Sequence, residues 1–237
     1  MIITIANMKG GCGKSTTADM MASILAEKGM KVLAVDGDWQ SNLTQISGVN
    51  VEKKTLYDVI VNKVNPEDII IMNTDRGYDI IPGDMKLMDL NRMAPTGSLK
   101  SAMSKLQIRY DYIIIDTPPT PGSQLKECLT AADCVIVPSQ GNPHNRMSLQ
   151  VLADEIEAVT QHNNFLYVAG VLQTFYNPKT INGNQTEEYL KAGLDTLKTT
   201  LFESRIFDHR MVDDFSMYTN SYNKFVDEFL RRQEANL

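Results

Sequence analysis

Short apolar runs alternate with longer amphipathic stretches along most of this chain. The first run, residues 2–6, is almost wholly apolar, and apolar residues then recur at helical spacing over residues 16–28. A second apolar run, residues 31–35, comes soon after Gly29, a residue type common just past the end of a helix. Strands that are apolar on both faces are typical of a parallel sheet covered by helices on each side. The chain is therefore predicted to open as strand, helix, strand.

The same alternation continues beyond this unit. Further strands are predicted over residues 78–81, 112–115, 134–138, 166–172 and 201–206. Helices are predicted over residues 55–61, 85–93, 98–107, 124–131, 147–161, 185–199 and 221–232. This order predicts an α/β fold with a doubly wound, mostly parallel sheet and helices on both faces. No linker or composition shift divides the 237 residues, so we expect a single domain over residues 1–237.

Composition and charge narrow the class of protein. With 43% hydrophobic and 22% charged residues, the chain can bury a sizeable core and is not a disordered polymer. Apolar runs stay well short of the roughly 20 residues that span a bilayer, and Met1 leads straight into the first strand without a basic signal region. We therefore expect a cytoplasmic protein. The net charge of −6 argues against a strongly basic nucleic-acid binder but leaves room for a local basic patch.

The segment after the first strand carries the strongest chemical signal. It reads Asn7-Met8-Lys9-Gly10-Gly11-Cys12-Gly13-Lys14-Ser15-Thr16 and joins a strand to a helix, as a phosphate-binding loop does. Glycines let the backbone curl with its N–H groups inward, where oriented amides and a helix N-terminus bind phosphate. Lys14 would hold the outer phosphates of a nucleoside triphosphate, and the Ser15 hydroxyl would ligate Mg²⁺. The strict pattern requires glycine at position 8, where this chain has Met8.

An extra lysine, Lys9, stands just before the glycines. The form Lys-Gly-Gly-x-Gly-Lys-Ser resembles the deviant Walker motif of the ParA/MinD family of ATPases. The resemblance implies ATP and Mg²⁺ as cofactors and a catalytic role for Lys14. In that family the first lysine reaches across an ATP-bound homodimer to the partner's nucleotide, so Lys9 is implied to act in trans. The implied nucleotide-binding residues are Lys9, Gly10, Gly11, Cys12, Gly13, Lys14, Ser15 and Thr16, with no chemical role expected for the Cys12 thiol.

A second motif follows the strand at residues 31–35. It reads Asp36-Gly37-Asp38-Trp39-Gln40-Ser41-Asn42 and resembles the family signature Asp-x-Asp-Pro-Gln-x-Asn. By that resemblance Asp36 helps to organise the Mg²⁺ shell, and Asp38 positions or activates the attacking water. Trp39 replaces the family's proline, a change that affects loop stiffness more than chemistry.

A third motif is an apolar strand that ends in an acid and a Thr-Pro-Pro turn, over residues 110–119. It resembles a Walker B motif of the ParA/MinD type, in which Asp116 holds Mg²⁺ through water. In open α/β sheets ligands bind outside the carboxyl ends of the strands, so the three motifs should face one another. The resemblance extends from residue 1 to about residue 173.

The resemblance implies a role in DNA segregation. ParA-type proteins partition plasmids and chromosomes; their ATP-bound dimer binds DNA without sequence preference, and a centromere-binding ParB-type partner stimulates hydrolysis. Nucleoid association in the ATP state would follow. Weak DNA binding by one subunit would strengthen on dimerisation, because the number of phosphate contacts doubles. Candidate DNA contacts are Lys179, Lys191, Lys198, Arg205, Arg210 and Lys224.

The main alternative is a MinD-like, membrane-cycling ATPase that positions cell division or another cargo. Such proteins end in a basic amphipathic helix, and residues 222–234 are amphipathic here, with Phe225, Val226, Phe229 and Leu230 at helical spacing. The polar face mixes acidic and basic residues, which argues against binding to anionic lipid. We therefore expect this segment to pack on the sheet and not to form a stable membrane anchor.

A third interpretation is a redox ATPase similar to the nitrogenase iron protein, which shares an iron–sulfur cluster between subunits through two cysteines of each. Cys128 and Cys134 do not stand in glycine-rich loops, and with Cys12 they form no C-x-x-C pair. We expect all three to be reduced thiols, with Cys128 in a helix and Cys134 in a strand.

Overall fold

The computed structural model describes residues 1–51, 54–72, 74–140, 145–177, 197, 199–209 and 215–235, without the side chains at 145, 146 and 215. Within these residues seven strands form one sheet in the order β3-β2-β4-β1-β5-β6-β7. The strands are β1 (Ile2–Ile5), β2 (Val32–Asp36), β3 (Asp79–Ile81), β4 (Tyr112–Asp116), β5 (Cys134–Ser139), β6 (Tyr167–Tyr176) and β7 (Leu201–Phe207). All neighbouring pairs in this sheet are parallel, which confirms the predicted doubly wound fold.

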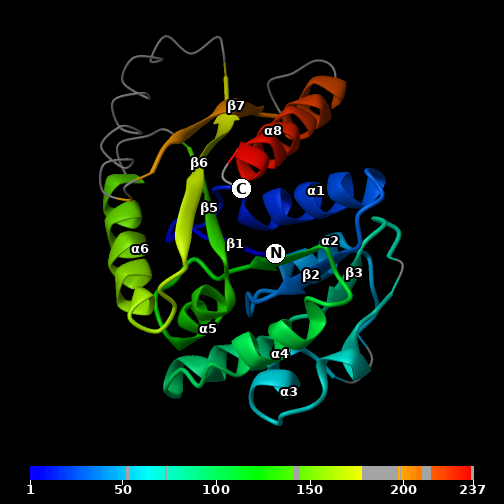
Figure 1. Cartoon of the computed structure of the whole chain (residues 1–237), viewed down its shortest axis with the longest axis vertical. Coiled ribbons are helices and arrows are strands. Elements are labelled where there is room, and N and C mark those ends of the chain that lie inside the picture. Colours follow the sequence, from blue (N-terminus) through cyan, green and yellow to red (C-terminus); the bar gives the residue numbers. More distant parts are fainter. Residues whose placement is uncertain are drawn as a thin grey trace.

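Helices cover both faces of the sheet (Figure 1). They are α1 (Lys14–Glu27), α2 (Asn42–Ile46), α3 (Leu56–Ile60), α4 (Ser98–Leu106), α5 (Ser123–Ala131), α6 (Asn145–Thr160) and α8 (Phe215–Ala235), with 3₁₀ helices η1 (Pro66–Ile69) and η2 (Met85–Arg92). Figure 1 shows α1 and α8 on one face, and α3, α4, α5 and α6 on the other.

The apolar strands supply both cores because their side chains alternate between the two faces. On β4, Ile114 packs into the core beneath α1 and α8, whereas Ile113 and Ile115 pack into the core beneath α3 and α4. A third cluster joins α5 and α6 to β5 through residues such as Leu152 and Val135. Burial on both faces explains why these strands read as continuous apolar runs.

The C-terminal helix α8 packs on the sheet, as its amphipathic pattern predicts. Phe225, Val226 and Phe229 are fully buried in the core that α8 shares with α1. The apolar face that an amphipathic anchor would place in a membrane is therefore covered by protein. No described helix combines the length and apolar character needed to cross a bilayer.

Most element predictions are confirmed within a few residues, and the differences have physical reasons. Helix α2 and the 3₁₀ helix η1 are missed because each is short and has few apolar residues, whereas the equally short α3 has Leu56, Val59 and Ile60 at helical spacing. Residues 85–92 form a 3₁₀ helix and not an α-helix. The helix predicted over residues 185–199 falls outside the described residues, except at 197 and 199. The expectation of a single domain stays a prediction.

Candidate active site

Three strand ends bring the sequence motifs together at one edge of the sheet. Asp116, the last residue of β4, is in register with Ile5 of β1 on one side and with Asp36 of β2 on the other. The loop after β1 and the loop after β2 therefore leave the sheet as neighbours of Asp116. This confirms the expected meeting of the three motifs at the carboxyl ends of the strands.

The loop between β1 and α1 has the backbone of a phosphate cradle. Gly11 and Gly13 adopt φ values of +68° and +91°, a region where glycine is favoured over any residue with a Cβ. A Cβ built on Gly10 or Gly11 would meet no protein atom within 4 Å. Because both residues line a cavity, such a side chain would take space from a bound ligand.

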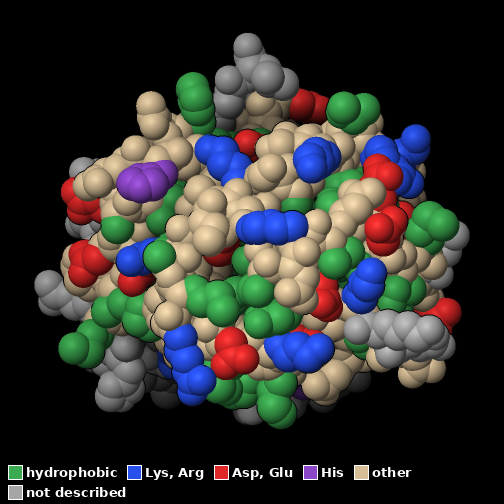
Figure 2. All heavy atoms as spheres, turned by 90° about the horizontal axis from the view of Figure 1, so that it is seen from below, with side chains coloured by type: hydrophobic (Ala, Val, Ile, Leu, Met, Phe, Trp, Pro, Cys, Tyr) green, Lys and Arg blue, Asp and Glu red, His purple; other side chains and the backbone are tan. Residues whose placement is uncertain are grey.

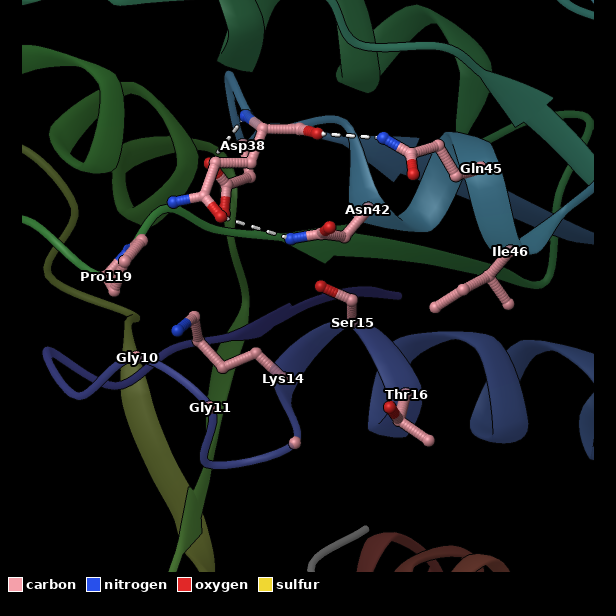
Figure 3. A pocket seen from close by; sticks show the side chains of 12 residues that line it. Gly10, Gly11, Lys14, Ser15, Thr16, Asp38, Asn42, Gln45, Ile46 and Pro119 are labelled. Atoms are coloured by element: carbon pink, nitrogen blue, oxygen red, sulfur yellow. Dashed lines mark hydrogen bonds between the residues drawn. The ribbon is translucent and has the colours of Figure 1, made fainter.

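The cavity in front of this loop has a volume of about 340 Å³. Figure 3 shows Lys14 and Ser15 on one side of it, with Asp38, Asn42 and Gln45 opposite. Its lining residues are Gly10, Gly11, Gly13, Lys14, Ser15, Thr16, Asp38, Gln40, Asn42, Gln45, Ile46 and Pro119. Seven of these belong to the predicted site.

Two predicted loop residues, Lys9 and Cys12, do not line the cavity. Lys14 Nζ donates a hydrogen bond to the carbonyl oxygen of Lys9 at 3.2 Å, whereas the ammonium of Lys9 donates to Gln140 Oε1 at 3.4 Å. The Cys12 side chain is buried, and its carbonyl oxygen accepts a hydrogen bond from Thr174 Oγ1 at 2.9 Å. Cys12 can therefore serve a ligand only through its backbone.

Asp36 is fully buried and already bonded through both oxygens. Its Oδ2 accepts hydrogen bonds from the backbone N–H of Thr44 at 2.7 Å and from the Thr44 hydroxyl at 2.6 Å. Its Oδ1 accepts from the N–H of Asp38 at 3.2 Å. Burial raises the pKa of Asp36, and these donors oppose the rise. Asp36 thus fixes the start of α2 and the loop that carries Asp38.

Asp116 is also fully buried, but only one of its carboxylate oxygens accepts a hydrogen bond from a described residue. Oδ1 accepts from the N–H of Thr117 at 3.0 Å, while Oδ2 has no hydrogen-bond partner among the described residues. Burial and the neighbouring Asp36 raise the pKa of Asp116, whereas the Ser15 hydroxyl and Lys14 lower it. A buried carboxylate oxygen without a donor, close to a hydroxyl, fits a cation shell.

The residues at this site fit a Mg²⁺ ion that is held partly by water and phosphate better than a metal ion whose ligands are all protein side chains. In the described part of the chain, no three His, Cys, Asp or Glu side chains gather to hold a metal. Mg²⁺ usually takes one or two protein ligands and completes its shell with water and substrate phosphates. Ser15 and Asp116 form a donor set of this kind.

Asp38 lies on the cavity wall opposite Lys14 (Figure 3). Its carboxylate is 3% exposed, and Oδ1 accepts a hydrogen bond from the N–H of Gln40 at 3.0 Å. Burial raises the pKa of Asp38, opposed by that N–H and by Lys14. A held carboxylate at the cavity surface can orient a water molecule.

Supporting contacts between these motifs were missed by the sequence analysis. The N–H of Gly37 donates to the carbonyl oxygen of Asp116 at 3.0 Å, and Gln124 Nε2 donates to the carbonyl oxygen of Gly37 at 2.6 Å. Gln40 and Asn42 also line the cavity. Their position within the second motif could have identified them as site residues. No sequence pattern links Gln124 to Gly37, because 87 residues separate them.

The cysteines are placed as predicted and do not offer a cluster site. All three are free and buried, with Cys128 on α5 and Cys134 on β5. Burial raises the pKa of all three thiols, that of Cys134 to about 12. Buried thiols on a helix and an inner strand do not form the exposed loops that a shared iron–sulfur cluster needs.

Two of the six candidate DNA contacts are described, and they lie together. Arg205 and Lys224 line a hollow of about 410 Å³ beside β7 and α8, which also includes Tyr176 and Glu203. The Arg205 guanidinium stacks over the Tyr176 ring at 4.9 Å. On the face seen from below, Figure 2 shows basic and acidic side chains interspersed. The other four candidates, Lys179, Lys191, Lys198 and Arg210, lie outside the described residues.

A glycine-rich loop between β1 and α1, with acids at the ends of β2 and β4, defines a P-loop protein of the doubly wound α/β class. The family model described as an AAA domain matches residues 1–168. The chain is 38% identical over 200 residues to the sporulation initiation inhibitor protein Soj of Bacillus subtilis (strain 168), an alignment that covers 80% of this chain and 78% of Soj.

Solved structures agree with this assignment. A cobyrinic acid a,c-diamide synthase from Mycobacterium smegmatis with bound ADP and magnesium superposes with a TM-score of 0.87 and 29% identity, covering 100% of this chain and 96% of that chain. A plasmid partition protein from Borrelia burgdorferi gives a TM-score of 0.78 and 30% identity, covering 98% of each. The chain belongs to the ParA/MinD family of P-loop ATPases.

Proposed function

We propose that this chain is an ATP-hydrolysing switch of the ParA type, which dimerises with ATP and acts in plasmid or chromosome segregation. The proposal depends above all on the unpartnered Oδ2 of buried Asp116, close to Ser15 and behind an open, glycine-lined cavity. That arrangement suits a Mg²⁺-bound triphosphate. The similarity to a plasmid partition protein supports the cellular role.

Each site residue has a proposed task. Lys14 and the amides of the loop hold the phosphates, with Ser15 and Asp116 holding Mg²⁺, directly or through water. Bound Mg²⁺ would neutralise charge on the phosphates during transfer. Asp36 acts indirectly, since its hydrogen bonds to Thr44 and Asp38 fix the opposite wall of the cavity.

The proposed reaction converts ATP and water to ADP and phosphate. Asp38 accepts a hydrogen bond from the attacking water and so aligns it with the outer phosphate. Lys9 acts in trans on the nucleotide of a second copy of the chain. Its ammonium lies outside its own cavity lining, which supports this role.

DNA binding is proposed for the ATP-bound dimer, with a ParB-type partner that stimulates hydrolysis and ends the bound state. Arg205 and Lys224 are the described candidates for phosphate contacts, and Glu203 in the same hollow reduces the local positive charge. Binding by one subunit would therefore be weak, and two linked subunits would bind much more tightly. We propose a cytoplasmic protein that associates with the nucleoid in its ATP state.

A gel shift on non-specific duplex DNA at low salt tests this function. The assay compares no nucleotide, ADP and ATP, with Asp38→Ala included to hold the ATP state. We expect binding with ATP only, and weaker binding as the salt concentration rises, because phosphate contacts release counterions.

Absence of DNA binding in every nucleotide state would contradict the proposal. The same samples would then be mixed with liposomes of anionic lipid, since ATP-dependent sedimentation with them would indicate a MinD-like membrane cycle. The buried apolar face of α8 leads us to expect no sedimentation.

A further inference from the structure

The Gln140 side chain bonds both to the ammonium of Lys9 and to the backbone of the glycine-rich loop, and the sequence analysis gave it no role. It follows Ser139, the last residue of β5. Its Nε2 donates a hydrogen bond to the carbonyl oxygen of Gly11 at 2.8 Å, and its Oε1 accepts one from Lys9 Nζ at 3.4 Å. A single amide therefore connects the cradle of the loop to the charged end of Lys9.

The two bonds differ in length, and the difference is informative. At 2.8 Å the bond to Gly11 has the usual length of a strong N–H···O hydrogen bond, whereas 3.4 Å is near the upper limit for one. Gln140 thus holds the backbone of the loop firmly, whereas its own contact with the Lys9 ammonium is weak.

Further hydrogen bonds brace the backbone of the loop on both sides of Lys9. Asn7 Nδ2 donates to the carbonyl oxygen of Pro138 at 2.7 Å, and Asn7 Oδ1 accepts from the N–H of Lys9 at 3.0 Å. On the other side, Thr174 Oγ1 donates to the carbonyl oxygen of Cys12 at 2.9 Å. These contacts fix the backbone of Lys9, so a change in its position is confined to the long, flexible side chain.

We propose that Gln140 is a positioning residue that keeps the Lys9 ammonium beside β5 within one subunit and releases it when a second copy of the chain docks with ATP. This inference rests on the proposed function and adds a regulatory contact to it. Gln140 lowers the fraction of subunits whose Lys9 can reach a partner, and so it opposes premature dimerisation.

Two substitutions separate the hold on Lys9 from the hold on Gly11. Gln140→Leu removes both bonds at similar volume. Gln140→Glu also loses the donor to Gly11 but offers Lys9 a carboxylate, which binds an ammonium more strongly than an amide oxygen does. The two variants therefore differ in their effect on Lys9 and share their effect on Gly11.

The first experiment measures the ATP-dependent dimer dissociation constant by sedimentation, with Asp38→Ala as the parent to prevent hydrolysis. We expect Gln140→Glu to dimerise at least about threefold more weakly than Gln140→Leu, because a carboxylate retains the lysine more strongly. Affinity of the monomer for ATP, measured below the dimerisation concentration, corrects for direct repulsion of phosphate by the new carboxylate.

A second measurement follows Lys9 without relying on dimerisation. Reductive methylation of the nucleotide-free chain, quantified by mass spectrometry, reports the accessibility of the Lys9 amine relative to exposed Lys105. Gln140→Leu should raise the Lys9 rate at least about twofold, and Gln140→Glu should not, because only the leucine lacks an acceptor.

The outcomes separate this inference from the proposed function. An Asp38→Ala parent that stays monomeric with ATP would overturn the proposed function and the release step together. A parent that dimerises, while the two Gln140 variants have equal dimer constants and equal Lys9 rates, would overturn the role of Gln140 alone.

Discussion

Gly37 stands between the two acids of the second motif and has no room for a side chain. A Cβ at this position would lie 2.6 Å from the carbonyl oxygen of Asp116 and 2.8 Å from Cys128 Sγ. The carbonyl belongs to an inner strand and cannot move without disturbing the sheet. Close approach of β2 and β4 at the site therefore depends on glycine here.

Gly37→Ala should destabilise the whole chain. We expect a loss of about 1–3 kcal/mol in the free energy of unfolding, the usual cost of forcing a methyl group into a packed core. Urea unfolding at neutral pH measures it. Gly10→Ala is the matched control, because a Cβ there meets no protein atom within 4 Å but enters the cavity. It should keep its stability and lose ATP affinity; equal stability of both variants would contradict this account.

Lys14 and Asp38 face each other across the cavity and should fail in different ways when removed. Lys14→Ala loses the charge that holds the outer phosphates and should abolish productive ATP binding. Asp38→Ala should bind ATP and dimerise but reduce turnover by at least about a hundredfold, the lower range for loss of a positioned proton acceptor. Calorimetric titration with ATP and a phosphate-release assay measure the two effects. A fully active Asp38→Ala enzyme would remove the residue from the mechanism.

At the scale of the element, the predictable parts are those with a local pattern. All seven strands of the described sheet are found from the sequence. The inner strands β1, β2, β4 and β5 are apolar runs because both of their faces are buried, whereas in edge strand β7 only Phe202 and Ile206 are buried. Helix α2 is missed because Leu43 and Ile46 are its only apolar residues, too few to show a helical period. The cavity wall at Gln45 and Ile46 is missed with it.

In the candidate site, too, the residues within local motifs could be predicted and the contacts between distant residues could not. Lys14, Ser15 and Asp38 are found because each lies in a short motif next to a strand end. The braces are not found, since Gln124 reaches Gly37 over 87 residues and Gln140 reaches Gly11 over 129. Such contacts arise only when the sheet forms, so a local pattern carries no trace of them.

Glu228 on α8 holds this helix against strand β7, and its contribution to stability should depend on pH. Its carboxylate accepts hydrogen bonds from the N–H groups of Glu203 and Ser204, both at 2.8 Å, and pairs with Arg232. Burial alone would raise the pKa of Glu228, but the two N–H donors and then Arg232 outweigh it and lower the pKa. The helix is thereby tied to edge strand β7.

Glu228→Gln should lower the free energy of unfolding by about 1–3 kcal/mol at pH 7, because an amide N–H₂ must then face a backbone donor. A lowered folded pKa stabilises the protein above the unfolded pKa and loses that effect as pH falls through the folded value. The difference from wild type should therefore shrink below about pH 4. Urea unfolding at pH 7 and at about pH 3 measures it, with exposed Glu234→Gln on the same helix as control. A difference that persists unchanged at about pH 3 would contradict the role of charge.

At the scale of the whole molecule, the fold identifies a nucleotide-binding protein but does not identify its cellular role. The solved structures that superpose well include a cobyrinic acid a,c-diamide synthase and a plasmid partition protein. One sheet thus carries different tasks, and the task must be argued from the site and its partners. The DNA and liposome assays therefore decide more than any further structural likeness would.

The candidate site also lowers the stability of the nucleotide-free protein, and we expect Asp116 to make the largest contribution to this loss. Its carboxylate is fully buried, lies in register beside buried Asp36, and has one oxygen without a hydrogen-bond partner among the described residues. Buried charges in this arrangement destabilise a fold unless a cation joins them. Natural proteins retain such groups where function requires them.

Asp116→Asn should therefore raise the stability of the nucleotide-free chain while it removes the response to ligand. The amide keeps the shape of the carboxyl and removes the cost of burying an acid whose pKa burial and Asp36 raise, so we expect the melting temperature to rise by about 2–4 °C, equivalent to roughly 1 kcal/mol. Wild type should gain about 2.7 kcal/mol from ATP and Mg²⁺ at one hundred times the dissociation constant, and the variant should gain far less.

Differential scanning calorimetry with and without ATP and Mg²⁺ measures both effects in one series. Asp89→Asn is the matched control, because this side chain is 53% exposed on η2 and its contact is a surface ion pair with Arg92. It should change neither the melting temperature nor the response to ligand. If Asp116→Asn melts below wild type, or keeps the full response to Mg²⁺, then Asp116 is a structural acid and the magnesium site must be sought elsewhere in the cavity.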